Sequence, residues 1–385
     1  MNIIYITTAQ ETSDFDKFAE LWKHPINPSN QVFHNKLIRA LSITNHVDVI
    51  SLRPFSKELT GVKKLLKVKK LTSQITWNYL KVINNKPLRY FSYLMNSLLI
   101  VRKCPKDSLI ITDTINPSCV TLANNISKRY KMPIIGVCTD SPSNITGTTR
   151  KYTKSILKVA KDLSGYICLT TGLNDLFNEQ NRPCLVIEGL VEDNRPDKIE
   201  NKYGKYILMA GALSEKYGLY NLIEAFNKYN FNNRLNLVIC GHHGDDGKIA
   251  TSINGNDNIF YLGQLSNKEV MQLEASAYAN INPRPFNEDL DRYSIPSKVL
   301  EYLNSGVPTI SVKNTKLYKI FSEDIIWAKS NSPEDLIEAF DKLKTISAKE
   351  QKSLALKARD DVNHYFSLNA ANTRLNGFLY LFRKK

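Results

Sequence analysis

The sequence lacks several features that would assign it to a class directly. Its six cysteines form no CxxC pair and no zinc-type spacing, which predicts free thiols in a reducing compartment. No apolar run approaches the roughly 18 residues that a membrane-spanning helix needs. The opening MNIIYITTAQ has no basic lead-in, so we expect a first strand rather than a signal peptide. Together these absences predict a cytoplasmic protein.

One long stretch lacks acidic residues. Thr60–Lys106 contains eleven lysines or arginines and no aspartate or glutamate, in a chain whose formal net charge is +15. Its aromatic residues are interleaved with the basic ones. The apolar residues of its first half fall at helical spacing, which predicts basic amphipathic helices: Leu71, Ile75, Tyr79, Val82 and Ile83.

Such a surface prefers anionic partners. We predict that Thr60–Lys106 holds the protein at the inner face of an anionic cell membrane, as a peripheral protein. The alternative is a pair of helices that pack on the sheet and leave a solvated basic face. The chain carries no recognised nucleic-acid-binding module, so we expect no nucleic-acid partner.

The first strand–loop–helix unit also lacks a glycine fingerprint. Asn2–Thr7 predicts a buried strand, and Gln31–Leu41 has the apolar period of a helix. Without a GxGxxG pattern nothing here indicates a dinucleotide site. Asn30, Gln31 and His34 take that region instead. They are either acceptor-side ligands or residues that cap the helix.

Strand and helix patterns alternate along the whole chain. This βαβ rhythm predicts an α/β fold with parallel sheets, and 385 residues exceed one typical core. A polar stretch with Pro196 and Gly204 separates two rhythmic halves. We predict one Rossmann-like domain over 1–195, a second over 205–355, and C-terminal amphipathic helices over 356–385.

Two aspartates directly follow predicted strands of the first half. Asp113 comes after Leu109–Thr112, and Asp140 comes after Ile134–Thr139. Ligands of open parallel sheets bind at the carboxyl ends of the strands, so both residues are candidates for the acceptor side. The alternative is that each aspartate caps the helix that follows it.

A turn of small residues follows the predicted strand Tyr206–Ala210. Gly211 and Ala212 allow the backbone to approach a diphosphate, and Lys216 supplies a cation to neutralise it. On its own this turn is a weak signal. It gains weight because a second phosphate-type pattern occurs further along the chain.

That second pattern lies in Ala279–Val312, which reads as strand, charged loop, helix and strand. Ser297 and Lys298 stand at the start of the helix, where free backbone N–H groups and a cation suit a phosphate. Glu301 lies one turn into the helix, where its carboxylate can accept hydrogen bonds from two vicinal hydroxyls. Arg284 follows the first strand as a further cation.

The segment SIPSKVLEYLNSGVPTI resembles the motif of the large retaining glycosyltransferase family 4. The likeness is greatest to its bacterial polysaccharide-synthesis branch. It implies the GT-B architecture, in which two Rossmann-like domains face a cleft and C-terminal helices cross back to the first domain. The second domain would hold a UDP- or GDP-linked sugar donor, and the first a glycan or lipid-linked glycan acceptor. The implied reaction is sugar transfer with retention, for capsular, exopolysaccharide or cell-wall glycan synthesis.

The resemblance also implies roles for single residues. Lys216, Arg284 and Lys298 would stabilise the leaving diphosphate, and Glu301 would bind the nucleotide ribose. The family has two glutamates separated by seven residues, and the first position falls on Tyr293 here, which puts the usual sugar contact in doubt. Three acids of the preceding loop are candidate substitutes: Glu288, Asp289 and Asp291.

We expect no metal and no other cofactor. The DxD-like run Asp289–Asp291 is not needed by GT-B enzymes, and adjacent residues of a loop such as His242 and His243 rarely converge on one ion. Two other functions stay open. One is a GT-B sugar-nucleotide epimerase or hydrolase that transfers nothing, and the other is a basic adaptor that only retains the fold.

Overall fold

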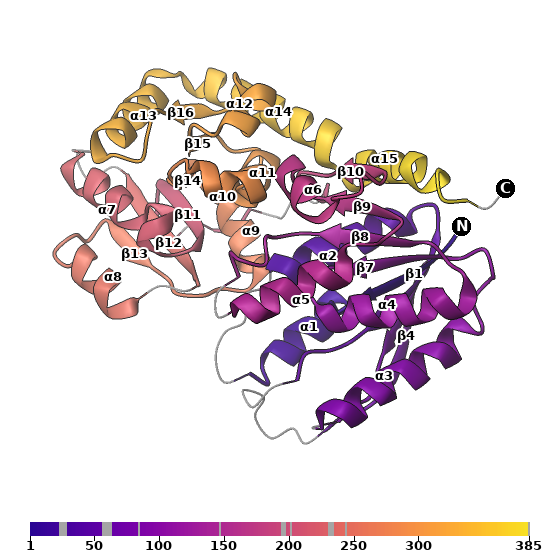
Figure 1. Cartoon of the computed structure of the whole chain (residues 1–385). Coiled ribbons are helices and arrows are strands. Elements are labelled where there is room, and N and C mark those ends of the chain that lie inside the picture. The colour runs from indigo at the N-terminus through magenta and orange to yellow at the C-terminus, as the bar shows by residue number, and fades with distance from the viewer. Residues whose placement is uncertain are drawn as a thin grey trace. The chain divides into compact units, whose positions relative to one another are not determined.

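The computed structural model describes residues 1–22, 29–55, 64–83, 85–145, 148–193, 198–200, 202–229, 235–242 and 245–383. The chain forms two compact units. Unit 1 comprises Met1–Leu190, Asp289–Ile295 and Leu368–Lys385, and unit 2 comprises Val191–Glu288 and Pro296–Ser367. Each unit has a predominantly parallel sheet with helices packed on it (Figure 1). The predicted α/β fold with two Rossmann-like domains is confirmed.

The larger sheet of unit 1 runs in the order β10-β9-β8-β7-β1-β2-β5-β4, and all neighbours are parallel except β4, which is antiparallel to β5. The short strands β3 and β6 pair separately. The strands are β1 (Asn2–Thr7), β2 (His46–Ser51), β3 (Lys64–Leu65), β4 (Val68–Thr72), β5 (Ile75–Tyr79), β6 (Val82–Ile83), β7 (Leu109–Asp113), β8 (Ile134–Cys138), β9 (Gly165–Cys168) and β10 (Cys184–Val186).

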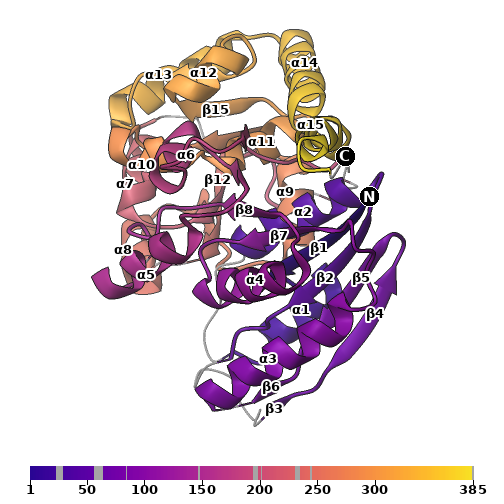
Figure 2. The same cartoon turned by 45° about the vertical axis from the view of Figure 1, so that its right-hand side comes forward.

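Helices cover both faces of this sheet (Figure 2). Because successive side chains of a strand point to opposite faces, Ile4 and Ile6 pack with residues of α3 and α4, whereas Ile3 and Tyr5 pack with residues of α2 and α15. The helices of unit 1 are α1 (Thr12–Ala19), α2 (Ser29–Ser42), α3 (Lys86–Val101), α4 (Pro117–Tyr130), α5 (Arg150–Ala160), α6 (Thr171–Phe177) and α15 (Leu368–Tyr380).

The prediction of amphipathic helices throughout the acid-free stretch, Thr60–Lys106, is wrong for its first half. The helical spacing of Leu71, Ile75 and Tyr79 is coincidental, because these residues belong to the antiparallel strands β4 and β5. The true period is two: Ile75, Trp77 and Tyr79 belong to one apolar cluster on one face of the sheet. Among the described residues of this stretch, only those of α3 form a helix. Residues 60–63 lie outside the described ranges.

The sheet of unit 2 is entirely parallel, in the order β13-β12-β11-β14-β15-β16. Its strands are β11 (Tyr206–Ala212), β12 (Asn236–His242), β13 (Ile259–Tyr261), β14 (Ala279–Asn282), β15 (Thr309–Val312) and β16 (Ile326–Ala328). The central strands are buried on both faces, as expected of a parallel sheet between helices, and β11 and β12 are mostly apolar.

The helical elements of unit 2 are η1 (Glu215–Tyr217, a 3-10 turn), α7 (Leu219–Lys228), α8 (Asp246–Ile253), α9 (Asn267–Ser276), α10 (Glu288–Tyr293, which continues into unit 1), α11 (Ser297–Asn304), α12 (Thr315–Phe321), α13 (Pro333–Thr345) and α14 (Ala348–Phe366). The chain then returns to unit 1, where α15 packs against α2 and Thr44 donates to Asn372 over 2.9 Å. Among the described residues, no helix is long and apolar enough to cross a membrane.

Candidate functional site

The carboxyl end of β11 is a close-packed glycine turn. A Cβ at Gly218 would lie 2.1 Å from the Pro283 carbonyl oxygen, and its φ of +79° favours glycine. A Cβ at Gly241 would lie 1.7 Å from the carbonyl oxygen of Gly211. Gly241 therefore lets the ends of β11 and β12 lie close together, and Gly218 lets the start of α7 contact the residue after β14.

Helix α11 is fixed to this turn by Tyr302. The Tyr302 hydroxyl accepts a hydrogen bond from the Ala210 N–H over 2.8 Å and donates to the Ala210 carbonyl over 2.9 Å. Burial raises the pKa of Tyr302 above its ordinary range, so the hydroxyl keeps the proton that it donates. This pair of bonds places the first turn of α11 beside Gly211, whose Cβ position is 3.5 Å from Lys298 Cγ.

Lys298 lies between two carboxylates. Its Nζ is 2.6 Å from Glu301 Oε2 and 3.1 Å from Glu274 Oε1, and the side chain of Glu274 is only 3% exposed. Burial by itself would lower the pKa of Lys298, but Glu274 and Glu301 outweigh it and hold this pKa well above the usual value. Lys298 is thus a permanently charged ammonium group held in one position by two anions.

The other donor-side candidates follow the carboxyl ends of β11 and β14 or begin α11. Ala212 is half-buried at the end of β11, and Lys216 is exposed in the η1 turn. Ser297 begins α11, whose N-cap residue Pro296 gives no side-chain cap hydrogen bond. Arg284 is half-buried and follows β14 by two positions. Unit 2 therefore brings together the predicted turn, the helix start and the predicted cations at the carboxyl ends of parallel strands.

Tyr293, at the position of the family's first glutamate, belongs to unit 1 and packs against its apolar core. The neighbouring Arg292 carbonyl accepts a hydrogen bond from Thr170 over 2.8 Å. Of the three candidate substitutes, Glu288 and Asp289 are exposed whereas Asp291 is 4% exposed.

In unit 1 a polar cluster lies at the carboxyl ends of β7 and β8. Asp113 Oδ2 accepts a hydrogen bond from Asn30 Nδ2 over 3.2 Å and is 3.6 Å from His34 Nε2. His34 Nδ1 is 2.6 Å from the Tyr5 hydroxyl, and Thr139 donates to Asn30 Oδ1 over 3.0 Å. Tyr5, His34 and Asp113 are fully buried. The structure thus joins three of the five predicted acceptor-side residues.

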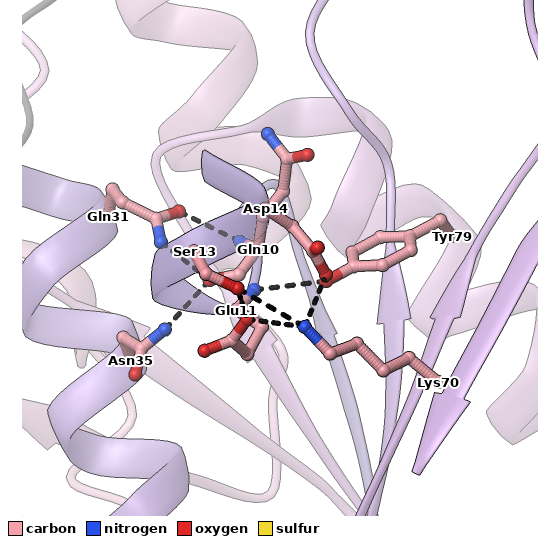
Figure 3. Close-up of polar contacts among 8 residues, drawn as sticks. All are labelled: Gln10, Glu11, Ser13, Asp14, Gln31, Asn35, Lys70 and Tyr79. Carbon is pink, nitrogen blue, oxygen red and sulfur yellow. Dashed lines mark hydrogen bonds and ion pairs between the residues drawn. The ribbon is translucent and has the colours of Figure 1, made fainter. Parts of the chain in front are cut away.

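Gln31 faces the loop after β1 instead. Its side chain accepts from the Gln10 N–H over 2.8 Å and donates to the Gln10 carbonyl over 2.5 Å, while Asn35 donates to the same carbonyl over 2.7 Å (Figure 3). These three hydrogen bonds fix the Gln10 backbone in the loop after β1. The adjoining Glu11 continues into a charged cluster with Lys70 (Figure 3).

The capping alternative for the two aspartates is wrong. Asn116 caps α4 and Thr149 caps α5, each by accepting a backbone N–H bond. Asp113 accepts instead from the Ile115 N–H over 3.1 Å, and Asp140 accepts from the N–H of its neighbour Ser141 over 2.8 Å.

Sequence reasoning missed Glu274 and Tyr5. Glu274 is an acid between buried apolar neighbours at the end of α9, directly before β14, and an acid in that pattern predicts a buried cationic partner. Tyr5 looks like any aromatic core residue of β1, and only its partner His34 reveals a polar role. Among the described residues, no group of three or more His, Cys, Asp or Glu side chains is arranged to hold a metal ion, and His243 lies outside those residues.

Comparisons with known proteins bear on the fold and on the class of protein. Residues 191–361 match the family model described as Glycosyl transferases group 1. No curated protein sequence matches the chain. Among solved structures, sucrose-phosphate synthase from Thermosynechococcus elongatus is similar at 10% identity, with 99% of each chain covered and a TM-score of 0.70.

Two further structures have the same architecture. Trehalose-6-phosphate synthase OtsA matches at 12% identity over 98% of each chain, with a TM-score of 0.68. Anabaena Alr3699/HepE in complex with UDP matches at 12% identity over 99% of this chain and 100% of that chain, with a TM-score of 0.65. The fold is therefore GT-B. Together with the domain match over 191–361, it shows that the protein is a glycosyltransferase.

Proposed function

We propose that the protein transfers a sugar from a UDP- or GDP-linked donor to a glycan or lipid-linked glycan acceptor, with retention of configuration, as in family 4. The observation that carries this proposal is Lys298, fixed by Glu274 and Glu301 at the start of α11 and against Gly211. The solved complexes of HepE with UDP and with UDP-glucose support a nucleotide-sugar donor. The motif likeness further supports a place in bacterial capsular, exopolysaccharide or cell-wall glycan synthesis.

The chemistry requires stabilisation of the charge that develops on the leaving diphosphate. A fixed ammonium group and backbone N–H donors do this well, because they are already oriented before the reaction. Lys298 and the uncapped first turn of α11 supply such groups, and exposed Lys216 is available to a phosphate. Arg284 is the third cation that we assign to the diphosphate.

Glu301 has a second role in this proposal. A carboxylate has about four acceptor positions, so its ion pair with Lys298 leaves capacity for the two hydroxyls of the nucleotide ribose. Glu274, which is buried, would hold Lys298 from the other side. The two acids therefore differ in function: Glu301 binds donor and Glu274 positions the cation.

The Asn30–Asp113 pair and Asp140 are the groups of unit 1 that we assign to the acceptor. Asp113 and Asp140 lie at the carboxyl ends of β7 and β8, as ligand-binding residues of such sheets do, and Asn30 of α2 is hydrogen-bonded to Asp113. We propose that transfer needs no resident metal ion, and therefore that it persists in chelator. We also propose that the acid-free stretch holds the enzyme at an anionic membrane, where lipid-linked acceptors occur.

The decisive experiment is a calorimetric titration with UDP, GDP and their sugar conjugates, repeated with Glu301→Ala. Loss of a charge-assisted hydrogen-bond pair costs about 1.5–3 kcal/mol, which lowers donor affinity roughly tenfold or more. Glu224→Ala is the matched control. This glutamate of unit 2 is ion-paired with Lys228, four residues away on the same helix, but that helix is α7. Equal donor affinity in both variants would refute the assignment.

A second measurement separates the enzyme classes. A transferase releases nucleotide in proportion to added acceptor, whereas an epimerase or hydrolase acts on the donor alone. Binding of neither UDP, GDP nor their sugar conjugates would refute the proposed donor.

A further inference from the structure

The outward face of α3 is apolar. Leu88, Phe91, Met95 and Leu99 are 56%, 61%, 45% and 55% exposed. They follow one another three or four residues apart, so they form a single stripe along one side of the helix. We call these four residues the α3 stripe.

The opposite side of α3 is buried. Tyr93 and Val101 are 5% and 1% exposed and belong to the core that also contains residues of β1 and α4. Figures 1 and 2 both show α3 beside α4. A surface helix normally has a polar outer face, and an exposed apolar stripe is typical of a surface that contacts a partner or a membrane.

The charges around the stripe indicate what covers it. No aspartate or glutamate occurs anywhere in Thr60–Lys106, and exposed Arg102 and Lys103 directly follow the helix. A protein partner would be expected to meet a rim of mixed charge. The charges of this stretch are all basic, and basic side chains beside an apolar stripe are the pattern of helices that lie on anionic bilayers.

The edge strand β4 has exposed side chains on the same face of the sheet as α3. Ile50 belongs to the core cluster of α3 and pairs with Asn78, so Asn78 faces the α3 layer. Lys69 is the antiparallel partner of Asn78 and shares that face, as does Leu71, which is 67% exposed. Exposed basic and apolar side chains therefore continue from the helix to the sheet edge.

We propose that α3 docks the enzyme on a bilayer containing anionic phospholipid, with the α3 stripe among the acyl chains and the flanking cations at the headgroups. The helix has 16 residues and a length of about 24 Å, which suits a position in the plane of the interface. This inference rests on the proposed function, because it names the surface that would bring the enzyme to a lipid-linked acceptor.

Docking through the α3 stripe differs from purely electrostatic binding by lysines. Salt screens exposed charges, whereas burial of apolar side chains persists in high salt. Lys70 takes no part, because its Nζ is 2.6 Å from Glu11 Oε2 and 3.2 Å from Asp14 Oδ2 (Figure 3). Binding should therefore weaken in high salt but not disappear.

The test is flotation with vesicles of phosphatidylcholine containing a minor fraction of phosphatidylglycerol, at low salt and at about 1 M NaCl, where the Debye length is about 3 Å. We expect Phe91→Gln/Leu99→Gln to lower vesicle partitioning at least about tenfold at both salt concentrations. Ile320→Gln/Leu356→Gln is the matched control, because both residues are exposed apolar residues of unit 2. Equal partitioning of the stripe variant and the unmodified protein would overturn the proposal.

A positive probe complements this loss. Tryptophan fluorescence of Phe91→Trp should be quenched by brominated acyl chains, whereas that of Ile320→Trp should resemble the unmodified protein. Vesicle binding without quenching at position 91 would assign the contact to another surface. A dimer that Phe91→Gln/Leu99→Gln converts to a monomer, without vesicle binding, would instead make the stripe a contact between copies and overturn the proposal.

Nucleotide-sugar binding tests the proposed function separately from the docking surface. Nucleotide-sugar binding by the stripe variant should equal that of the unmodified protein, since the stripe lies in unit 1 and the donor groups in unit 2. Donor binding without vesicle binding would refute only the docking surface. Vesicle binding without donor binding would refute only the proposed function.

Discussion

The polar clusters of the two units are built differently. In unit 2, Lys298 and Glu301 are 29% and 25% exposed, and only their partner Glu274 is buried. In unit 1, Tyr5, His34 and Asp113 are all fully buried and bonded to one another or to Asn30. A ligand can reach the first cluster directly. It can reach the second through the half-buried members, Asn30 and Thr139.

We infer from this difference that the unit 2 cluster binds a ligand, whereas the unit 1 cluster mainly positions other groups. The unit 2 cluster presents charge to a ligand and carries an acid behind it that fixes the charge. The unit 1 cluster is mostly a support that fixes Asn30 and the ends of β7 and β8. Substitutions in unit 2 should therefore change donor affinity, whereas substitutions in unit 1 should first change stability.

The largest effect is expected from Lys298→Met. This change leaves Glu274 buried without its cation, and breaking a buried ion pair costs about 3–5 kcal/mol, toward the low end here because Lys298 is partly exposed. We expect a lower midpoint for unit 2 in scanning calorimetry and loss of donor binding in titration.

The pH dependence of the same variant checks the cause. In the unmodified protein the pKa of Lys298 is raised, so its contribution is complete below about 10.5 and is lost only as the pH rises through the folded-state value. In Lys298→Met the buried Glu274 carboxylate has lost this cation, which favours its protonated form, so the stability deficit should shrink as the pH falls. A deficit that is constant with pH, or one that Glu274→Gln fails to relieve in the double variant, would contradict this account.

Asp113→Ala should have the next largest effect and a different profile. The Asn30 amide and the Ile115 N–H lose a charged acceptor, and each such bond contributes about 1.5–3 kcal/mol. We expect unit 1 to melt earlier while the affinity for nucleotide-sugar stays unchanged. Asp107→Ala, at an exposed aspartate of the same unit, is the control. A fall in donor affinity equal to that of Lys298→Met would abolish the distinction between the clusters.

The sequence predicted the two clusters unequally for a physical reason. Lys298, Glu301 and Gly211 lie in local patterns in which the residue type at a helix start or strand end already limits the chemistry. Glu274 comes from another helix, and its pairing with Lys298 is a long-range contact that no local spacing encodes.

The same reasoning explains the errors in unit 1. The aspartates at the ends of β7 and β8 were identifiable because parallel strands end at one edge, but the partners of Asp113, Asn30 and His34, come from α2. Leu71, Ile75 and Tyr79 fit a helical period and a pair of strands equally well over so short a segment. In the structure a turn separates β4 from β5, and Ser73 in that turn has a φ of +52°, which is incompatible with an α-helix.

Tyr302→Phe should give a smaller loss with a clear signature. It removes the hydroxyl that bonds both backbone groups of Ala210, at a cost of about 1–2 kcal/mol. Tyr206→Phe is the matched control, because its buried hydroxyl also donates to a single carbonyl, that of Leu273, over 2.7 Å. We expect both variants to lower the melting midpoint of unit 2. Only Tyr302→Phe should weaken donor binding, since Ala210 directly precedes the Gly211 turn, and equal affinities would show that the turn does not depend on α11.

The smallest effect is expected at the charged cluster of unit 1, where Lys70 joins β4 to Glu11 and Asp14 of the loop and helix after β1 (Figure 3). Burial would raise the pKa of Glu11, but hydrogen bonds from Lys70 and Ser13 outweigh it and lower that pKa below 4.5. A lowered carboxylate pKa adds stability that is complete above the unfolded-state value and is lost as the pH falls through the folded-state value. Lys70→Met should therefore cost under about 1 kcal/mol at neutral pH, as exposed pairs do, and nothing in acid. Lys69→Met, on the opposite face of β4, should leave stability unchanged at both pH values and weaken vesicle binding instead, and the reverse pattern would show that Lys70 rather than Lys69 faces the membrane.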